Sequence, residues 1–158
     1  MLTTDELESY CCEHQLDAKL MRLAEPTSTV AAAAEVMGCP VDQIVKSILF
    51  LIDEEPVLVI ACGTARVDRR ALARHYNLSK KRVRLASADQ VAEYTGYVAG
   101  GLPPFGHLHL LPTLIDRRVL AQPTVYAGGG SEMALLRLEP ALLLRVVPAI
   151  VLDLVEGG

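Results

Sequence analysis

Lys46 is the residue of this sequence best placed to do chemistry, because it is the single charge in an otherwise apolar run from 44 to 52. Lysine seldom lies within such a run unless its amine reaches solvent or a partner. If the run is a β-strand, alternation puts Ile48 and Phe50 on the same face as Lys46 and Val45 on the other. The amine is then either part of a binding site or a group that reaches solvent at a strand end, and the sequence leaves both interpretations open.

A second candidate is the Gly/Pro loop, residues 96–107, which contains four glycines and two prolines but no acid, lysine or arginine. Glycine lets another molecule approach the main chain closely, and proline stiffens a loop while removing an N–H group. The remaining amides, those of Gly100, Gly101 and Leu102, could face a carbonyl, an oxyanion or a phosphate, whereas Pro103 cannot donate. The alternative is a tight surface turn that binds nothing.

Charge is distributed unevenly along the chain, whose formal net charge is −4. Residues 1–60 hold eleven acids, whereas residues 66–84 hold eight basic residues and one acid, Asp68. A phosphate backbone would prefer such a basic segment, although a solvated helix face would have the same composition. No carboxylate between Asp68 and Asp89 balances the segment, so we do not expect pairing within a helix. The basic residues are Arg66, Arg69, Arg70, Arg74, Lys80, Lys81, Arg82 and Arg84.

Several classes of function are disfavoured. His107 and His109 would share one face of a strand, but no third ligand is evident, and the four cysteines form no C-x-x-C pair, so we expect no metal. Aromatic residues make up only 4% of the chain, which argues against a single-strand binder that works through aromatic stacking. No apolar run reaches the roughly 18 residues that span a bilayer, and the acidic N-terminus is unlike a signal peptide. We therefore expect a reduced, cytoplasmic protein without a membrane partner.

Hydrophobic periodicity and turn signals predict the elements that must position these residues. A β-hairpin is expected from the strands 44–52 and 57–62, with Asp53, Glu54, Glu55 and Pro56 between them. Because strands outnumber helices and do not alternate with them, a mixed α+β fold is favoured over a doubly wound sheet. Helices are expected at 4–15, 28–37, 68–76, 87–96 and 140–145. Further strands are expected at 19–24, 82–86, 107–111, 113–115, 123–127, 133–138 and 150–155.

Five segments, in the same order, resemble the YbaK/EbsC family, the free-standing relatives of the prolyl-tRNA synthetase editing domain. The run 95–106 resembles the family's G-x-x-x-P loop, and 44–50 resembles the strand that carries the family lysine. The other three are 29–38, which resembles an early helix, and the later marks 111–116 and 125–130. The resemblance implies one domain over residues 1–158, with a largely antiparallel mixed sheet curled toward a barrel and flanked by helices.

The resemblance also implies an activity, the hydrolysis of mischarged aminoacyl-tRNA in trans, with no cofactor. Lys46 would line the editing pocket and hold a phosphate or carbonyl oxygen of the substrate. Amides of the Gly/Pro loop would hold the aminoacyl carbonyl and position the terminal ribose, while the substrate's own 2′-hydroxyl and a water complete the chemistry. Pro103 departs from the serine or threonine common in the family, which puts the amino-acid specificity in question.

The remaining site predictions follow from the same resemblance and from charge. Catalytic roles are expected for Lys46, Gly100 and Gly101. Substrate contacts are expected from Gly96, Leu102, Pro104, Gly128, Gly129 and Asp153. The expected substrate is a small amino acid carried by tRNA-Pro. Binding of the tRNA is expected at Arg66, Arg70, Arg74, Lys80 and Lys81. An aminoacyl-tRNA synthetase is a further expected partner, and DNA is not. A non-catalytic module that binds an aminoacyl or nucleotide group, or docks on a synthetase, is the alternative.

Overall fold

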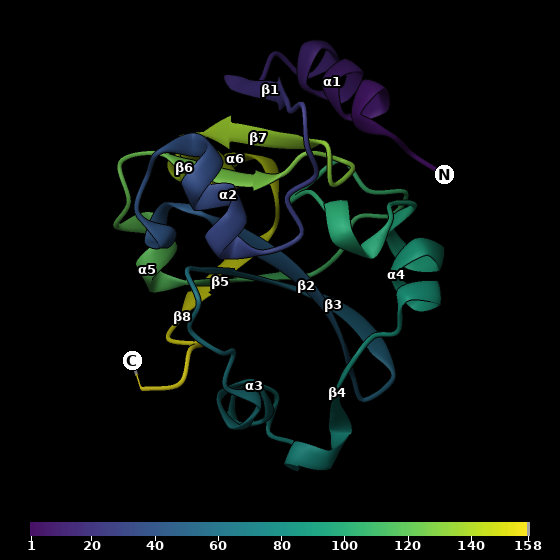
Figure 1. The fold of residues 1–158 in the computed structure, drawn as a ribbon. Coiled ribbons are helices and arrows are strands. Elements are labelled where there is room, and N and C mark those ends of the chain that lie inside the picture. Colours follow the sequence, from purple (N-terminus) through teal and green to yellow (C-terminus); the bar gives the residue numbers. More distant parts are fainter. Residues whose placement is uncertain (158) are drawn as a thin grey trace.

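The computed structural model describes residues 1–157 and contains two β-sheets with helices around them (Figure 1). The larger sheet has the strand order β4-β2-β3-β5-β8, and the smaller has the order β1-β7-β6. The strands of the larger sheet are β2 (Val45–Ile52), β3 (Glu55–Cys62), β4 (Val83–Leu85), β5 (Thr113–Asp116) and β8 (Ala149–Leu152). Those of the smaller sheet are β1 (Ala18–Arg22), β6 (Val125–Gly128) and β7 (Ala134–Leu138).

Strand pairing confirms the mixed α+β class but not the curled barrel. The β2–β3 hairpin and the β2–β4, β1–β7 and β6–β7 pairs are antiparallel, whereas β3–β5 and β5–β8 are parallel. Among the described residues neither sheet closes, because β4 and β8 remain edges of one sheet and β1 and β6 edges of the other. A single parallel bridge, Ile44 to Tyr126, links the start of β2 to β6.

Helix boundaries follow the capping signals in the sequence. Asp68 accepts a hydrogen bond from the Arg70 amide at the start of α3, and Ser87 with Gln90 forms a capping box at α4. Gly38 and Asn77 end α2 and α3 in the left-handed conformation. The helices are α1 (Thr4–Glu13), α2 (Val30–Met37), α3 (Arg69–Tyr76), α4 (Ala88–Thr95), α5 (Arg117–Leu120) and α6 (Ala141–Val146). Short 3₁₀ turns are η1 (Val41–Gln43), η2 (Lys80–Arg82) and η3 (Ala99–Gly101).

The strand predicted at 107–111 does not form. His107 instead turns back so that a ring nitrogen lies 2.8 Å from the Pro103 carbonyl oxygen, and Leu108 and Leu110 are exposed. A strand here would need a neighbouring strand edge to pair with its amides. The pairing along this part of the chain begins only with β5 at Thr113, and Pro112 just before it has no N–H to donate. The short helix α5 was not predicted.

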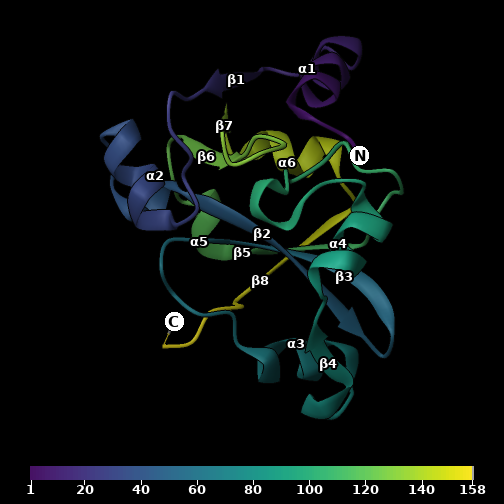
Figure 2. The same ribbon diagram turned by 45° about the vertical axis from the view of Figure 1, so that its right-hand side comes forward.

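The larger sheet separates two hydrophobic clusters. Figure 2 shows this sheet between α3 on one side and the smaller sheet on the other. On β2, Val45, Leu49 and Leu51 pack in one cluster with Leu102 and Phe105 of the Gly/Pro loop. The next residues along the same strand, Phe50 and Ile52, pack in the other cluster with Leu72 and Ala73 of α3. The alternation predicted from sequence is therefore confirmed for β2. No helix of residues 1–157 has the length and hydrophobicity to span a bilayer.

Candidate functional site

Lys46 lies on the α3 side of the larger sheet. In the β2–β3 register it stands opposite Ala61, which belongs to the cluster under α3. Its Nζ donates a hydrogen bond to the Ala65 carbonyl oxygen, 3.1 Å away, in the loop before α3. The side chain is half-buried, and this burial lowers the pKa of the ammonium group, while the charge of a Cys62 thiolate acts in the opposite direction. The Lys46 amine is thus fixed by a hydrogen bond to the backbone, unlike that of a freely mobile surface lysine.

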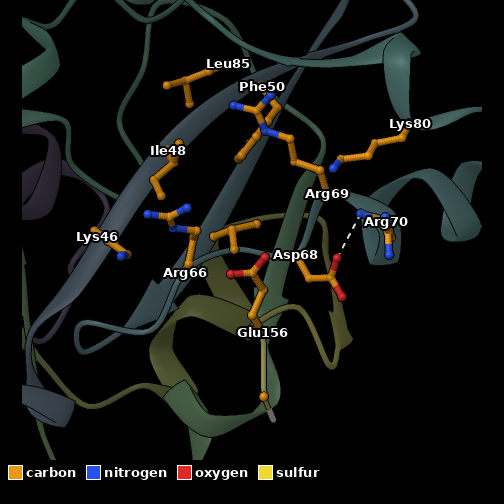
Figure 3. Close-up of a pocket in the computed structure, with 12 residues that line it drawn as sticks. Lys46, Ile48, Phe50, Arg66, Asp68, Arg69, Arg70, Lys80, Leu85 and Glu156 are labelled. Carbon is orange, nitrogen blue, oxygen red and sulfur yellow. Dashed lines mark hydrogen bonds between the residues drawn. The ribbon is translucent and has the colours of Figure 1, made fainter.

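A cavity of about 770 Å³ opens beside Lys46, between β2 and the segment that leads into α3 (Figure 3). Four further cations line it: Arg66, Arg69, Arg70 and Lys80. Apolar side chains of β2, β4 and the loop before α3 line it as well, namely Ile48, Phe50, Val67 and Leu85. Asp68 and Glu156 contribute the only carboxylates among the lining residues, and Asp68 also caps α3. Five cations against two acids make the cavity suited to an anion.

Two of the eight basic residues of 66–84 have protein partners that the sequence did not indicate. Arg82 lies 3.1 Å from Asp53, and Arg84 lies 2.9 Å from Glu54, both in the turn of the β2–β3 hairpin. These pairs are not within a helix, which is all that the sequence excluded; they form because β4 pairs with β2 and brings the hairpin turn to Arg82 and Arg84. Of the residues predicted to bind tRNA, Arg66, Arg70 and Lys80 line the cavity, whereas Arg74 and Lys81 do not.

The Gly/Pro loop at Gly101 and the glycine segment 128–130 are in backbone contact, and we call this contact the glycine junction. The Gly130 amide donates to the Gly101 carbonyl oxygen at 2.8 Å. A Cβ atom at Gly101 would lie 2.4 Å from the Ser131 amide nitrogen, and one at Gly128 would lie 2.2 Å from the Leu102 carbonyl oxygen. The Gly101 amide already donates to Val98, 3.1 Å away. These glycines are thus required by packing inside the protein, which the sequence alone did not separate from a role in binding.

The N-terminal segment holds this glycine junction in place. The Thr4 hydroxyl donates to the Gly129 carbonyl oxygen at 2.7 Å, and the Leu2 amide donates to the Gly96 carbonyl oxygen at 2.7 Å. Gly130 approaches the backbone of Thr4 so closely that a Cβ would lie 2.9 Å from its nitrogen. Sequence reasoning assigned no such role to the N-terminal segment, because contacts between residues so far apart in the sequence have no local signal.

Lys46 and the glycine junction are close in the fold but face different sides of the sheet. The Ile44–Tyr126 bridge places the first residues of β2 next to β6, which ends at Gly128. The Lys46 side chain nevertheless points to the α3 side, whereas Leu102 packs on the other side. No residue of the Gly/Pro loop is among those that line the cavity. The predicted site residues therefore form two groups in this structure.

Asp153, predicted to contact substrate, lies outside the cavity lining. Its carboxylate is exposed and pairs with Arg117 at 3.2 Å. The neighbouring acid Asp116 is the buried one, with 1% of its surface exposed. Asp116 accepts hydrogen bonds from the amides of Arg118, at 3.0 Å, and Leu154, at 2.7 Å, and so ties α5 to the chain after β8.

We expect Asp153→Ala to change the free energy of unfolding by less than about 1 kcal/mol, because exposed ion pairs contribute little. The rate of the ester hydrolysis that the family resemblance implies should stay within about twofold of that of the unaltered protein. Denaturant unfolding and an assay of that hydrolysis measure the two quantities. A large loss of activity with unchanged stability would show that Asp153 reaches the substrate after all.

Comparison with known proteins finds one matching family model and several related sequences. Residues 24–146 match the family model described as the aminoacyl-tRNA editing domain. The uncharacterized protein YwhH of Bacillus subtilis (strain 168) is 30% identical over 115 residues, covering 72% of this chain and 71% of that protein. The proline–tRNA ligase of Lactobacillus gasseri is 38% identical over 92 residues, which are 57% of this chain but only 16% of the ligase.

A solved structure is similar over almost the whole chain. It is a crystal structure of a protein described as a candidate trans-editing enzyme for prolyl tRNA synthetase, with a TM-score of 0.90 and 33% identity. The alignment covers 99% of this chain and all of that one. The similarity therefore includes α1 and β1, which precede the segment matched by the family model.

Proposed function

This chain belongs to the aminoacyl-tRNA editing domain family, and from that premise we propose that it deacylates mischarged aminoacyl-tRNA in trans. The reaction adds water to the ester carbonyl, releases the amino acid and returns the terminal ribose hydroxyl of the tRNA. The observation that carries the proposal is the half-buried Lys46, held by the Ala65 carbonyl in a cavity with four other cations. A polyanionic substrate and a developing oxyanion both favour such a site.

Lys46 would stabilise negative charge rather than act as a nucleophile. As water attacks, the carbonyl oxygen gains charge, and an ammonium held in a partly desolvated position stabilises that charge more than one in bulk water. The attacking water would be oriented by the substrate's own 2′-hydroxyl, so no side-chain base is required of the protein. The hydrogen bond to Ala65 fixes where Nζ lies before the substrate arrives, which limits reorganisation during the reaction.

The glycine junction would form the second part of the site, next to the start of β2. Within residues 1–157 the Leu102 amide has no backbone acceptor, but Leu102 is buried and its side chain packs on the side of the sheet opposite Lys46, so binding of a substrate carbonyl there would require the loop to move. Gly100 is exposed, and a Cβ atom added there would lie 2.7 Å from a carboxylate oxygen of Glu132. The close packing of Gly101 and Gly128 would then fix the position of these amides. The assignment of this loop to catalysis depends more on the family resemblance than on the geometry.

For the substrate we propose a small amino acid carried by tRNA-Pro. Similarity to proline–tRNA ligases and to a candidate trans-editing enzyme for prolyl tRNA synthetase supports this tRNA. A synthetase is a reasonable partner on the same ground. The non-catalytic alternative, a module that binds without hydrolysis, gains support from the packing role of the glycines and from Pro103, which lacks an amide.

A deacylation screen tests the proposed function. Purified protein at low concentration is incubated with a panel of mischarged tRNAs, and loss of the labelled amino acid is followed against the spontaneous rate. We expect turnover of one or a few small amino acids and none of large ones. Tight binding of aminoacyl-tRNA without any turnover across the panel would favour the binding module instead.

The lowered pKa of Lys46 predicts the pH dependence of the reaction. A lysine whose pKa is depressed loses its proton at lower pH than an ordinary lysine, whose pKa is about 10.4. If the charged form is required, the catalysed rate, corrected for spontaneous hydrolysis, should fall on the alkaline side before that value. Lys46→Arg keeps a charge at all these pH values and should remove the decline. An identical alkaline limb in that variant would show that another group titrates.

A further inference from the structure

Three adjoining hollows cross the surface of the protein away from Lys46. The first, between the end of α1 and α6, shares Tyr10 and Val146 with the second. The second shares the run 109–111 with the third, which lies at the turn of the β2–β3 hairpin. Because each hollow shares lining residues with the next, the three form one groove, which we call the α1–hairpin groove. Within residues 1–157, no residue that lines this groove also lines the cavity beside Lys46.

The groove is largely apolar where its second and third hollows meet. Leu110 lines both of them and is 78% exposed, more than any other leucine in the described part of the chain. A single exposed leucine is normal on a protein surface, but an exposed leucine beside an apolar hollow of about 770 Å³ is typical of a surface that binds a protein. The apolar and aromatic lining of that hollow includes Ile52, Val57, Tyr76, Leu78 and Tyr94.

The two ends of the groove carry opposite charge. Arg145 and His14 line the first hollow, and none of the described residues that line it is an acid. Asp53 and Glu55 line the third hollow, where no described lining residue is a lysine or arginine. Asp53 is paired with Arg82, whereas neither Arg145 nor Glu55 forms an ion pair within residues 1–157. An exposed cation and an exposed carboxylate, both without protein partners, therefore mark opposite ends of the groove.

A surface with this arrangement is complementary to itself. In a dimer with twofold symmetry each contact occurs twice, because a residue i of one copy meets a residue j of the other and j meets i. If two copies pack groove to groove in opposite directions, Arg145 of each copy lies opposite the partner's Glu55. Leu110, which lies between the two ends, is then close to the symmetry axis and can pack into the partner's apolar hollow. Any other partner would need an apolar side chain between an acid and a base at the same spacing, which this chain itself supplies.

We infer that the α1–hairpin groove is the interface of a symmetric homodimer, with Leu110 at its centre and two reciprocal ion pairs between Arg145 and Glu55 at its ends. The inference goes beyond the proposed function and does not depend on it, because the residues that line the cavity beside Lys46 take no part in the interface. Each copy has a net charge of −4, which opposes association, so we expect a dimer that dissociates in the micromolar range.

Sedimentation velocity of the purified chain tests the dimer, over a range of about 1 to 300 µM that suits a small interface. We expect the sedimentation coefficient to rise with concentration from the value of a monomer to that of a dimer. Leu110→Ser should raise the dissociation constant at least about tenfold, as is common for a residue at the centre of an interface. Leu85→Ser is the matched control and should leave the constant unchanged, because Leu85 is also exposed but lines none of the three hollows.

Charge reversal tests the reciprocal ion pairs and separates a second copy from every other occupant. Arg145→Glu alone and Glu55→Arg alone would each bring like charges together twice in the dimer, so each should weaken association at least about tenfold. An equimolar mixture of the two variants should associate again, as a heterodimer in which both contacts join opposite charges. The chain that carries both substitutions should dimerise as well, which would show that the reversed residues do not prevent folding.

Each contrary result has a definite meaning. A monomer at every concentration would overturn the inference. A dimer that Leu110→Ser and both charge reversals leave intact would place the interface elsewhere and would also overturn it. So would a mixture of the two reversed variants that stays monomeric while the unaltered chain dimerises. Because these measurements use neither RNA nor an ester, their failure would not bear on the proposed function, and a failed deacylation screen would not bear on the dimer.

Discussion

Lys46→Ala is expected to lower the rate of deacylation by about 10²- to 10³-fold, which is the loss found when a single group that stabilises an oxyanion is removed. The loss should appear mainly in kcat, because the cations Arg66, Arg69, Arg70 and Lys80 still attract the RNA. Stability should change by less than about 1 kcal/mol, since a hydrogen bond to Ala65 is lost but a partly buried charge is removed as well.

Lys46→Met is a second variant that keeps the aliphatic stem and removes only the charge, so it should lose as much activity as Lys46→Ala. Lys19→Ala, at an exposed lysine of β1, is the matched control and should retain full activity. Single-turnover kinetics and denaturant unfolding are the measurements. If the folded Lys46→Ala protein hydrolysed aminoacyl-tRNA at the parental rate, Lys46 would be a lysine whose amine only reaches solvent at a strand end.

Gly101→Ala is expected to destabilise the protein strongly, by about 3 kcal/mol or more, before any effect on catalysis is considered. The added methyl group would lie 2.4 Å from both the Cα and the amide nitrogen of Ser131, and these are backbone atoms that cannot rotate away. From the sequence, a methyl group at this position is expected to meet the substrate and to harm activity more than stability. The structure places Ser131 there instead, and so reverses the expected order of the two effects.

Gly100→Ala is the control one residue away. There the methyl group would meet the Glu132 side chain, which is flexible and can move, so we expect a loss of less than about 1 kcal/mol. Gly38→Ala isolates the other cost of replacing glycine, because its φ is +65° and nothing lies within 4 Å of the new atom. Denaturant midpoints of the three variants rank these effects. A Gly101→Ala protein as stable as Gly100→Ala would contradict the packing of the glycine junction.

The local elements were predictable because their signals lie within a few residues of one another. Asp68, Ser87 and Gly38 act at helix ends through their own side chain or backbone, and the structure confirms all three. The hairpin followed from apolar strands flanking Asp53 and Glu54, both of which adopt positive φ in the turn. The failure at 107–111 has a different origin, since an apolar segment becomes a strand only when a neighbouring edge is available to it.

The site was predicted in its parts but not in its arrangement. The sequence by itself determined that Lys46 faces the same side as Phe50, that Pro103 has no amide to donate and that 66–84 is basic, since each property depends on residue type and short spacing. Only the tertiary structure decided that Arg84 is paired with Glu54, whereas Arg69 faces the cavity.

The tertiary structure also decided that backbone atoms of Ser131 occupy the space where a side chain at Gly101 would lie. The physical reason is the same in each case. Strand order and the packing of distant loops set these contacts, and their energy depends on residues tens of positions apart, for which no single segment of the sequence carries a signal.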